Sequence, residues 1–127
     1  MKHLREKEEI GFEKELSDLR NKYKSKNIDL VIYPSSKVIG GATLSRIEVP
    51  KIERGKGFAT KAMIELISIA DRYGEILRLS PTSEFGASKE KLKEFYKRFG
   101  FVENKGKNKD YKISETMYRR PKFKHLD

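Results

Sequence analysis

Two glycines, Gly55 and Gly57, stand between a stretch with strand character and a stretch with helical periodicity. The first N–H groups of a helix have no acceptor within the helix, and the helix dipole makes that end positive. Glycine leaves such groups open to a ligand, and the neighbouring Arg54 and Lys56 add positive charge. This turn is therefore a candidate site for a phosphate or pyrophosphate.

Other interpretations of the turn can be compared on the same residues. No Gly-Lys-Ser or Gly-Lys-Thr occurs, which excludes a P-loop nucleotide site. The string Gly-Lys-Gly-Phe-Ala-Thr lacks the third glycine of a dinucleotide-binding fingerprint. A tight strand-to-helix turn that binds nothing remains an open alternative.

The pattern of apolar residues predicts the elements that hold the turn. Phe12, Leu16, Leu19 and Tyr23 recur at helical spacing and predict a helix in the first 26 residues. Strands are expected over 27–33 and 38–49, the second with a bulge or bend at Gly40-Gly41 and with Thr43, Ser45, Ile47 and Val49 on one face. After the turn we expect a helix over 58–73 stopped by Gly74, a strand over 75–80, a helix over 89–99, and two strands over 101–103 and 113–118.

This order of elements predicts one α/β domain with a central mixed sheet flanked by helices. We expect a single domain over 1–127, in which 1–26 form the N-terminal helix, 27–103 the core, and 104–127 a basic hairpin and tail.

Composition excludes several classes of function. The chain has no cysteine, and its two histidines, His3 and His125, lie near the ends of the sequence, so we expect no metal site and no cysteine nucleophile. No apolar run is long enough to span a membrane, and the first residues are too charged for a signal peptide. We therefore expect a cytoplasmic protein with no membrane partner, either a monomer or a homodimer.

The net charge of +10 is unevenly distributed. Residues 89–127 carry thirteen basic and six acidic side chains, most of the excess. Such a bias is typical of a protein with an anionic partner, although a solvated basic surface is an equal alternative.

Two stretches resemble the GNAT superfamily of N-acetyltransferases. In that family, a strand ending in Val leads through a Gln/Arg-x-x-Gly-x-Gly/Ala loop into a helix, and Val49 to Ala59 reproduce this spacing, with the Gln/Arg position assigned to Ile52. The run Phe95–Phe101 is similar to the family's second motif, which ends in Tyr-x-x-x-Gly-Phe, with Lys89 where an Asn is frequent. The resemblance covers residues 38–101 and implies a mostly antiparallel sheet that splays at a cofactor cleft.

The resemblance also implies acetyl-CoA as co-substrate. Its pyrophosphate would contact the turn, and its pantetheine arm would pair with the strand before it. The implied cofactor-binding residues are Ile47, Val49, Arg54, Gly55, Lys56, Gly57, Phe58, Ala59, Thr60 and Ser88. Ser45 and Ser80 are further possible polar contacts, and Ser88 is alternatively the N-cap of the helix that follows it.

By the same resemblance, Tyr96 is the expected general acid. A phenol is protonated at neutral pH and can donate a proton to a departing thiolate. Tyr96 could instead be a core aromatic on one helix face with Leu92 and Phe99. Glu48 is the candidate general base, with two alternatives: it points away or pairs with Arg46 or Arg78, or ordered water serves as the base.

The expected activity is acetyl transfer to an amine, on a macromolecule such as a protein lysine, tRNA or DNA. The sequence from Met117 to Pro121 is similar to that of compact GNAT-like proteins encoded by phages and prophages. The alternative is a non-catalytic, or nucleobase- or nucleic-acid-directed, GNAT-like binding protein that uses its basic C-terminal region. There Tyr111, Tyr118 and Phe123 alternate with basic residues, as stacking platforms do.

Overall fold

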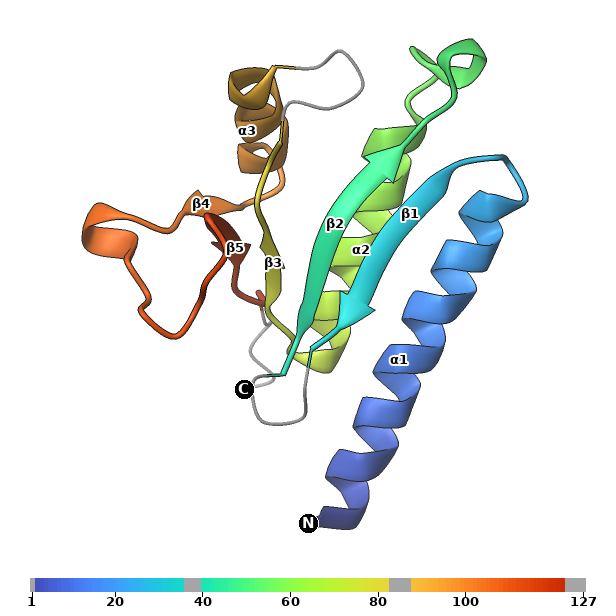
Figure 1. The fold of residues 1–127 in the computed structure, drawn as a ribbon. Coiled ribbons are helices and arrows are strands. Elements are labelled where there is room, and N and C mark those ends of the chain that lie inside the picture. Colours follow the sequence, from blue (N-terminus) through green and yellow to red (C-terminus); the bar gives the residue numbers. More distant parts are fainter. Residues whose placement is uncertain (1, 36–39, 83–87, 123–127) are drawn as a thin grey trace.

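A computed structural model describes residues 2–35, 40–82 and 88–122. Figure 1 shows a mixed sheet flanked by helices, so the predicted α/β class is confirmed. The elements are α1 (Lys2–Lys24), β1 (Asp29–Pro34), β2 (Ala42–Glu48), a 3₁₀ turn (Lys51–Glu53), α2 (Phe58–Tyr73), β3 (Leu77–Leu79), α3 (Lys89–Lys97), β4 (Val102–Glu103), a second 3₁₀ turn (Gly106–Asn108) and β5 (Met117–Arg119).

The five strands form one sheet in the order β1-β2-β3-β5-β4. Only β2 and β3 run parallel, and the other three neighbouring pairs are antiparallel. The mostly antiparallel mixed sheet expected from the sequence is therefore present. Strand β2 is connected to β3 by the crossover helix α2, because two neighbouring parallel strands require a crossover connection.

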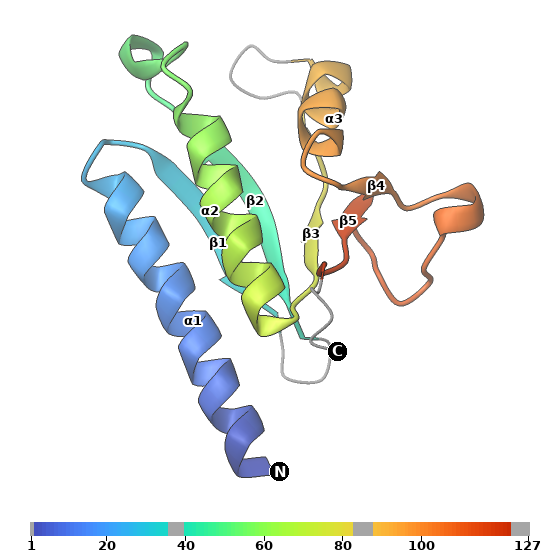
Figure 2. The same cartoon turned by 180° about the vertical axis from the view of Figure 1, so that it is seen from behind.

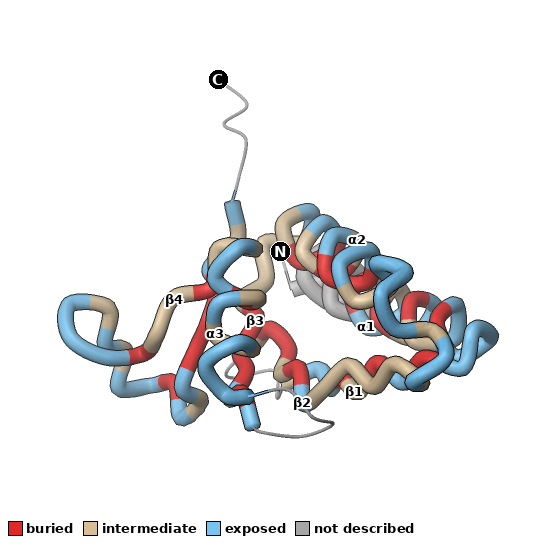
Figure 3. The backbone as a smooth tube through the Cα atoms, turned by 90° about the horizontal axis from the view of Figure 1, so that it is seen from above, coloured by how far each residue is buried: buried red, intermediate tan, exposed pale blue. Residues whose placement is uncertain are grey.

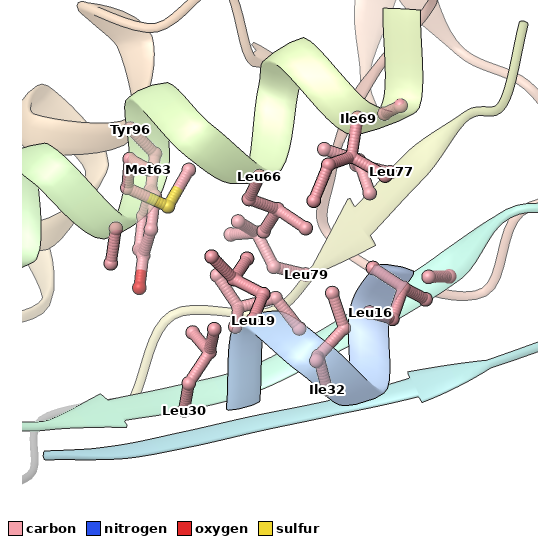
Figure 4. Close-up of a cluster of buried hydrophobic side chains, with 14 of the residues drawn as sticks. Leu16, Leu19, Leu30, Ile32, Met63, Leu66, Ile69, Leu77, Leu79 and Tyr96 are labelled. Carbon is pink, nitrogen blue, oxygen red and sulfur yellow. The ribbon is translucent and has the colours of Figure 1, made fainter. Parts of the chain in front are cut away.

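Helices α1 and α2 cover the same face of the β1–β2 part of the sheet (Figures 2 and 3). The apolar stripe predicted for α1 is buried against this face: Phe12, Leu16, Leu19 and Tyr23. Figure 4 shows how Leu16 and Leu19 meet side chains of β1, α2 and β3 in one cluster. Burial of this stripe stabilises an otherwise charged helix against the sheet.

The boundaries of α2 agree with the prediction, because glycines cap both ends. Gly57 and Gly74 adopt left-handed conformations with φ of 79° and 68°. Such values are readily adopted by glycine and are costly for other residues. Gly74 also donates its N–H to the last turn of the helix.

Strand β2 contains a bulge at Ser45. Arg46 pairs with Val31 and Leu44 pairs with Ile32, so Ser45 has no partner on β1. The extra residue reverses the alternation, and Leu44 and Ile47 both face the core. The expectation that Thr43 shares a face with Ile47 is therefore wrong, and the bulge lies five residues beyond Gly40.

The glycine pair at 40–41 forms a bend instead. Both residues have positive φ, and a Cβ on Gly41 would lie 2.2 Å from the carbonyl oxygen of Ile76. The N–H of Ala42 donates to this oxygen at 3.0 Å. The two parallel strands therefore begin in backbone contact at a position where only glycine fits.

The last two strands are shorter than predicted. In place of a long hairpin, residues 104–116 form a loop built around the buried side chain of Asn104. Strand β5 is fastened to α2 by Arg119, whose guanidinium donates to both carboxylate oxygens of Asp71 at 2.7 and 3.0 Å. Arg119 also donates to the Phe99 carbonyl at 2.8 Å, so each of the three nitrogens of this buried guanidinium makes a hydrogen bond.

Candidate functional site

Strands β2 and β3 pair over only three residues and then separate toward the end of β2 that leads into α2 (Figure 1). A cavity of about 230 Å³ lies where they part. We call it the cleft. Its walls come from β2, from the residues after β3, and from α3: Leu44, Ser45, Arg46, Ile47, Val49, Arg54, Leu79, Ser80, Pro81, Thr82, Leu92 and Tyr96.

Two local features explain why the strands part. The bulge at Ser45 follows directly after Leu44, the last β2 residue paired with β3, and a bulge bends the strand that carries it. On the other side, Pro81 cannot donate to a ladder. The residue before it, Ser80, is held on the side away from β2, because its Oγ accepts from the N–H of Thr116, next to β5, at 3.1 Å. The edge of β2 beyond Leu44 is therefore left without a strand partner on the β3 side.

The glycine turn lies at the end of this edge and holds a row of unpaired donors. Among the described residues, no acceptor is bonded to the N–H groups of the six consecutive residues Gly55–Thr60, and the first bonded N–H of the helix is that of Lys61. Gly57 occupies the N-cap position and offers no side chain to cap them. A Cβ built on either glycine would meet nothing within 4 Å. The turn is therefore open to a ligand and is positive at the helix N-terminus.

Cationic side chains surround the turn. Nζ of Lys56 lies 3.1 Å from a carboxylate oxygen of Glu53. The Nζ atoms of Lys26 and Lys61 lie over the ring of Phe58, at 6.0 and 5.7 Å from its centroid. Arg54 connects the turn to the cleft, because it lines the cavity and its Nε donates to the carbonyl of Val49 at 3.1 Å. Together these cations favour an anionic ligand on the turn.

Tyr96 belongs both to the core and to the wall of the cleft. Only 6% of it is exposed, and its ring meets Phe95 and Phe101 edge-on with centroids 5.3 and 5.8 Å apart. Burial raises the pKa of the Tyr96 hydroxyl to about 12. The phenol is therefore protonated at neutral pH and can give a proton to a ligand but cannot serve as a base. The two interpretations of Tyr96, core aromatic and cleft donor, are compatible.

Glu48 and Ser88, which the sequence suggested as site residues, are not among the residues that line the cleft. The carboxylate of Glu48 lies 3.5 Å from Nε of Arg46, one of the alternatives that the sequence left open. Ser88 caps α3, because its Oγ accepts from the N–H of Lys91 at 3.2 Å. Neither side chain forms part of the cleft wall, and their predicted contacts with a ligand stay predictions.

The other predicted residues gather as two adjoining groups. Ile47, Val49, Arg54 and Tyr96 line the cleft, and Gly55–Thr60 form the turn at its end. Sequence reasoning missed the cleft role of Arg46, whose Nε is buried without a hydrogen bond. It also missed Thr82. The signal for Arg46 is the bulge, which cannot be recognised without the pairing partner β1.

Ile52 was assigned to the polar position of the loop pattern, but its side chain is 81% exposed and is not part of the cleft wall. None of the described residues that line the cleft carries a carboxylate. The described histidines, aspartates and glutamates form no group of three that could hold a metal ion. In the described part of the chain, no helix has the length and apolar character of a membrane span.

Comparisons of the chain with protein-family models, with curated proteins and with solved structures found no match. The function of the cleft and the turn must therefore be argued from their own geometry.

Proposed function

We propose that this chain is an N-acetyltransferase of the GNAT type that transfers an acetyl group from acetyl-CoA to an amine. The observation that carries the proposal is the row of six unpaired N–H groups at Gly55–Thr60, set at the end of a cleft between two parting strands. A linear ligand with an anionic middle and an amide-bearing arm fits this combination. The anionic part would accept from the turn, and the arm would lie along β2.

The unpaired edge of β2 suits the amide-bearing arm. Beyond Leu44, the strand offers backbone groups up to Val49 with no partner strand on the β3 side. One of them, the Val49 carbonyl, is bonded to Arg54. The Arg54 side chain therefore has to move if a ligand is to accept or donate at Val49, and it would then be free to meet the pyrophosphate.

The position of Arg54 also corrects the comparison with the family pattern. Counted back from Gly57 and Ala59, the polar position of Gln/Arg-x-x-Gly-x-Gly/Ala is Arg54, and Ile52 lies outside the motif. The cleft-lining location of Arg54 supports this assignment. The pattern is then matched without a departure in this loop.

The chemistry assigned to the cleft is direct transfer. The lone pair of a neutral amine attacks the thioester carbonyl, a C–N bond forms and the C–S bond breaks. Tyr96 gives its hydroxyl proton to the departing sulfur and regains a proton from the amine nitrogen through water, so that an amide and a thiol are produced. We assign the base to water, because Glu48 is not part of the cleft wall.

Calorimetric titration with acetyl-CoA at physiological ionic strength tests the binding site. S-acetylpantetheine, which has the same thioester arm and no pyrophosphate, provides the comparison. We expect saturable binding of acetyl-CoA and affinity for the truncated thioester that is weaker by about 100-fold or more, because several charge-assisted hydrogen bonds are lost. Equal affinity for both ligands would exclude the turn as the pyrophosphate site, and no binding of either would refute the proposal.

A matched pair of glycine variants separates ligand contact from backbone strain. Gly57 and Gly106 both have positive φ, and a Cβ on either would meet nothing within 4 Å. Alanine at each should cost a similar ~1–2 kcal/mol of folding free energy. Only Gly57→Ala should weaken acetyl-CoA binding, by roughly tenfold or more, because its Cβ enters the ligand's space. Transfer itself is tested by mass spectrometry of candidate macromolecular amines after incubation with labelled acetyl-CoA.

A further inference from the structure

A second feature of the molecule lies outside the cleft. Residues 104–112, which we call the basic loop, project from the β4–β5 end of the sheet (Figures 1 and 3). The basic loop contains four lysines and one aspartate: Lys105, Lys107, Lys109, Lys112 and Asp110. It also carries Tyr111, which is 90% exposed and is the most exposed large apolar side chain among the described residues.

The loop is held in one conformation by a buried amide. Nδ2 of Asn104 donates to the carbonyls of Asp110, Ile113 and Glu115 at 3.3, 2.9 and 3.0 Å, and Oδ1 accepts from the Asp110 N–H at 2.7 Å. Asn104 is only 8% exposed, so these bonds are protected from water. The exposed side chains are thus presented by a fixed backbone, which lowers the entropy cost of binding a partner.

The single acid of the loop does not neutralise its lysines. Both oxygens of the Asp110 carboxylate are engaged, one by Arg120 at 2.7 Å and the other by the N–H of Lys112 at 2.9 Å. Nζ of Lys105 forms an ion pair with Oε1 of Glu103 at 3.6 Å. Within the described part of the chain, Lys107, Lys109 and Lys112 are exposed and form no ion pair. The outer surface of the loop is therefore cationic.

The exposed ring and the lysines are close together. Nζ of Lys109 lies 5.4 Å from the centroid of Tyr111, and Lys112 follows it directly in the chain. An acidic protein surface would need only the charges. A flat aromatic ring without cover, flanked by cations, matches instead the stacking of an unpaired base beside its own phosphates.

We propose that the basic loop binds single-stranded nucleic acid, with a base stacked on Tyr111 and phosphates on Lys107, Lys109 and Lys112. Duplexes fit less well, because their bases are already stacked and paired. Thr116 connects the loop to the cleft: its carbonyl accepts from the N–H of Asn104 at 2.8 Å, and its N–H donates to Ser80, which lines the cleft. The proposal does not depend on acetyl transfer, since nucleic acid and acetyl-CoA would contact different residues.

Fluorescence anisotropy with labelled oligouridine, oligothymidine and a mixed-sequence duplex tests this proposal. Tyr111→Ala should weaken single-strand binding by about 5- to 150-fold, which corresponds to one stacked base. Tyr111→Phe keeps the stacking face and should bind like the parent. Because Tyr111 is exposed, both variants should melt at the temperature of the parent protein.

A charge-matched pair of double variants tests the phosphate contacts. Lys107→Gln with Lys109→Gln should reduce the slope of log K against log salt by about 1.4. Lys14→Gln with Lys24→Gln removes the same charge from exposed positions of α1 and should leave the slope unchanged.

Four results would overturn the proposal: equal effects of the two double variants, wild-type affinity of Tyr111→Ala, duplex affinity equal to single-strand affinity, or equally effective competition by polyglutamate. The last result would indicate an acidic protein as partner. A preference for oligouridine or for oligothymidine would support the proposal and identify RNA or DNA as the ligand. Acetyl-CoA titration of the same variants should be unchanged, so failure here and failure of the proposed function are distinguishable.

Discussion

Tyr96 and Tyr118 are two buried tyrosines whose hydroxyl groups have different surroundings. Both are 6% exposed. The Tyr118 hydroxyl donates to the carbonyl of Asn108, whereas the Tyr96 hydroxyl has no hydrogen-bond partner among the described residues and lies in the cleft wall. A tyrosine hydroxyl that lines a cleft and has no protein acceptor is available to a ligand atom.

Substitution of each tyrosine by phenylalanine should therefore have opposite effects. Tyr96→Phe should lower the rate of acetyl transfer by about 100-fold or more and change the free energy of unfolding little, because no protein hydrogen bond is lost. Tyr118→Phe should cost about 1 kcal/mol of stability and leave the rate unchanged. Urea unfolding and single-turnover kinetics measure the two quantities, and a Tyr96→Phe enzyme with full activity would exclude the general-acid role.

The ion pair of Asp71 with buried Arg119 predicts a pH-dependent contribution to stability. Burial alone would raise the pKa of Asp71, but the hydrogen bonds from Arg119 and from the Lys122 N–H outweigh it and leave the pKa below its ordinary 3.8. Because the pKa is lowered on folding, the stabilisation is present above the unfolded value and is lost as pH falls through the folded one.

Asp71→Asn should accordingly destabilise the protein by ~3–5 kcal/mol at neutral pH, since it leaves the Arg119 charge buried without a counter-charge. The deficit relative to the parent protein should shrink once the pH falls below 3.8 and approaches the lowered pKa of Asp71. Asp18→Asn is the control, because Asp18 pairs with Lys14 on the exposed face of α1 and should contribute about 0.5 kcal/mol or less. Urea titrations at several pH values measure both differences, and equal losses would contradict the argument.

At the scale of elements, one of the two features that part β2 from β3 is the residue of β2 without a partner on β1. The bulge at Ser45 keeps Leu44 and Ile47 on the core face while the strand bends away from β3. If Ser45 were removed, Arg46 would follow Leu44 in regular alternation, and every β1–β2 pair could persist. We therefore expect the bulge to be dispensable for the core and to be needed for the opening.

Deletion of Ser45 should give a folded protein within about 1–2 kcal/mol of the parent that no longer binds acetyl-CoA. Insertion of a second serine after Ser45 should instead turn Ile47 and Val49 away from the core and destabilise the protein strongly. Thermal unfolding and calorimetry on the two variants check the contrast. If the deletion variant bound acetyl-CoA normally, the bulge would not be the cause of the separation of the strands.

Local signals made several elements predictable. The boundaries of α2 could be read because glycine is needed at both caps, and the start of α3 because Ser88 is a good N-cap. The buried face of α1 follows from its apolar stripe. The glycine turn could likewise be recognised, since its chemistry depends on consecutive residues.

The features that could not be predicted depend on partners distant in the sequence. The bulge exists only relative to β1, and the orientation of Glu48 depends on that bulge. The shortness of β5 follows from Asn104, whose amide takes the carbonyls of Ile113 and Glu115, two groups that a longer hairpin would have used in its ladder. No pattern within a short window indicates that one amide organises twelve following residues.

For the whole molecule, binding of acetyl-CoA should be visible as a change in stability. A ligand at 100 times its dissociation constant stabilises the folded state by about 2.7 kcal/mol. For a domain of this size, each kcal/mol raises the melting temperature by about 4 °C, so we expect a rise of about 10 °C. Differential scanning fluorimetry measures it. Coenzyme A should give a similar rise and inorganic pyrophosphate a smaller one, whereas no rise with either would contradict a site on the turn.

The position of β5 in the sheet has a consequence for biosynthesis. Ribosomes deliver the chain from its N-terminus, and β5 follows the other four described strands in the sequence, yet it lies between β3 and β4. Until Met117–Arg119 emerge, β3 lacks one neighbour, β4 lacks its only one, and Asp71 lacks its arginine. During translation β3 is therefore the exposed edge of a three-stranded sheet, and β4 stays unpaired until β5 has been made. It is in this interval that a chaperone would find β3 exposed.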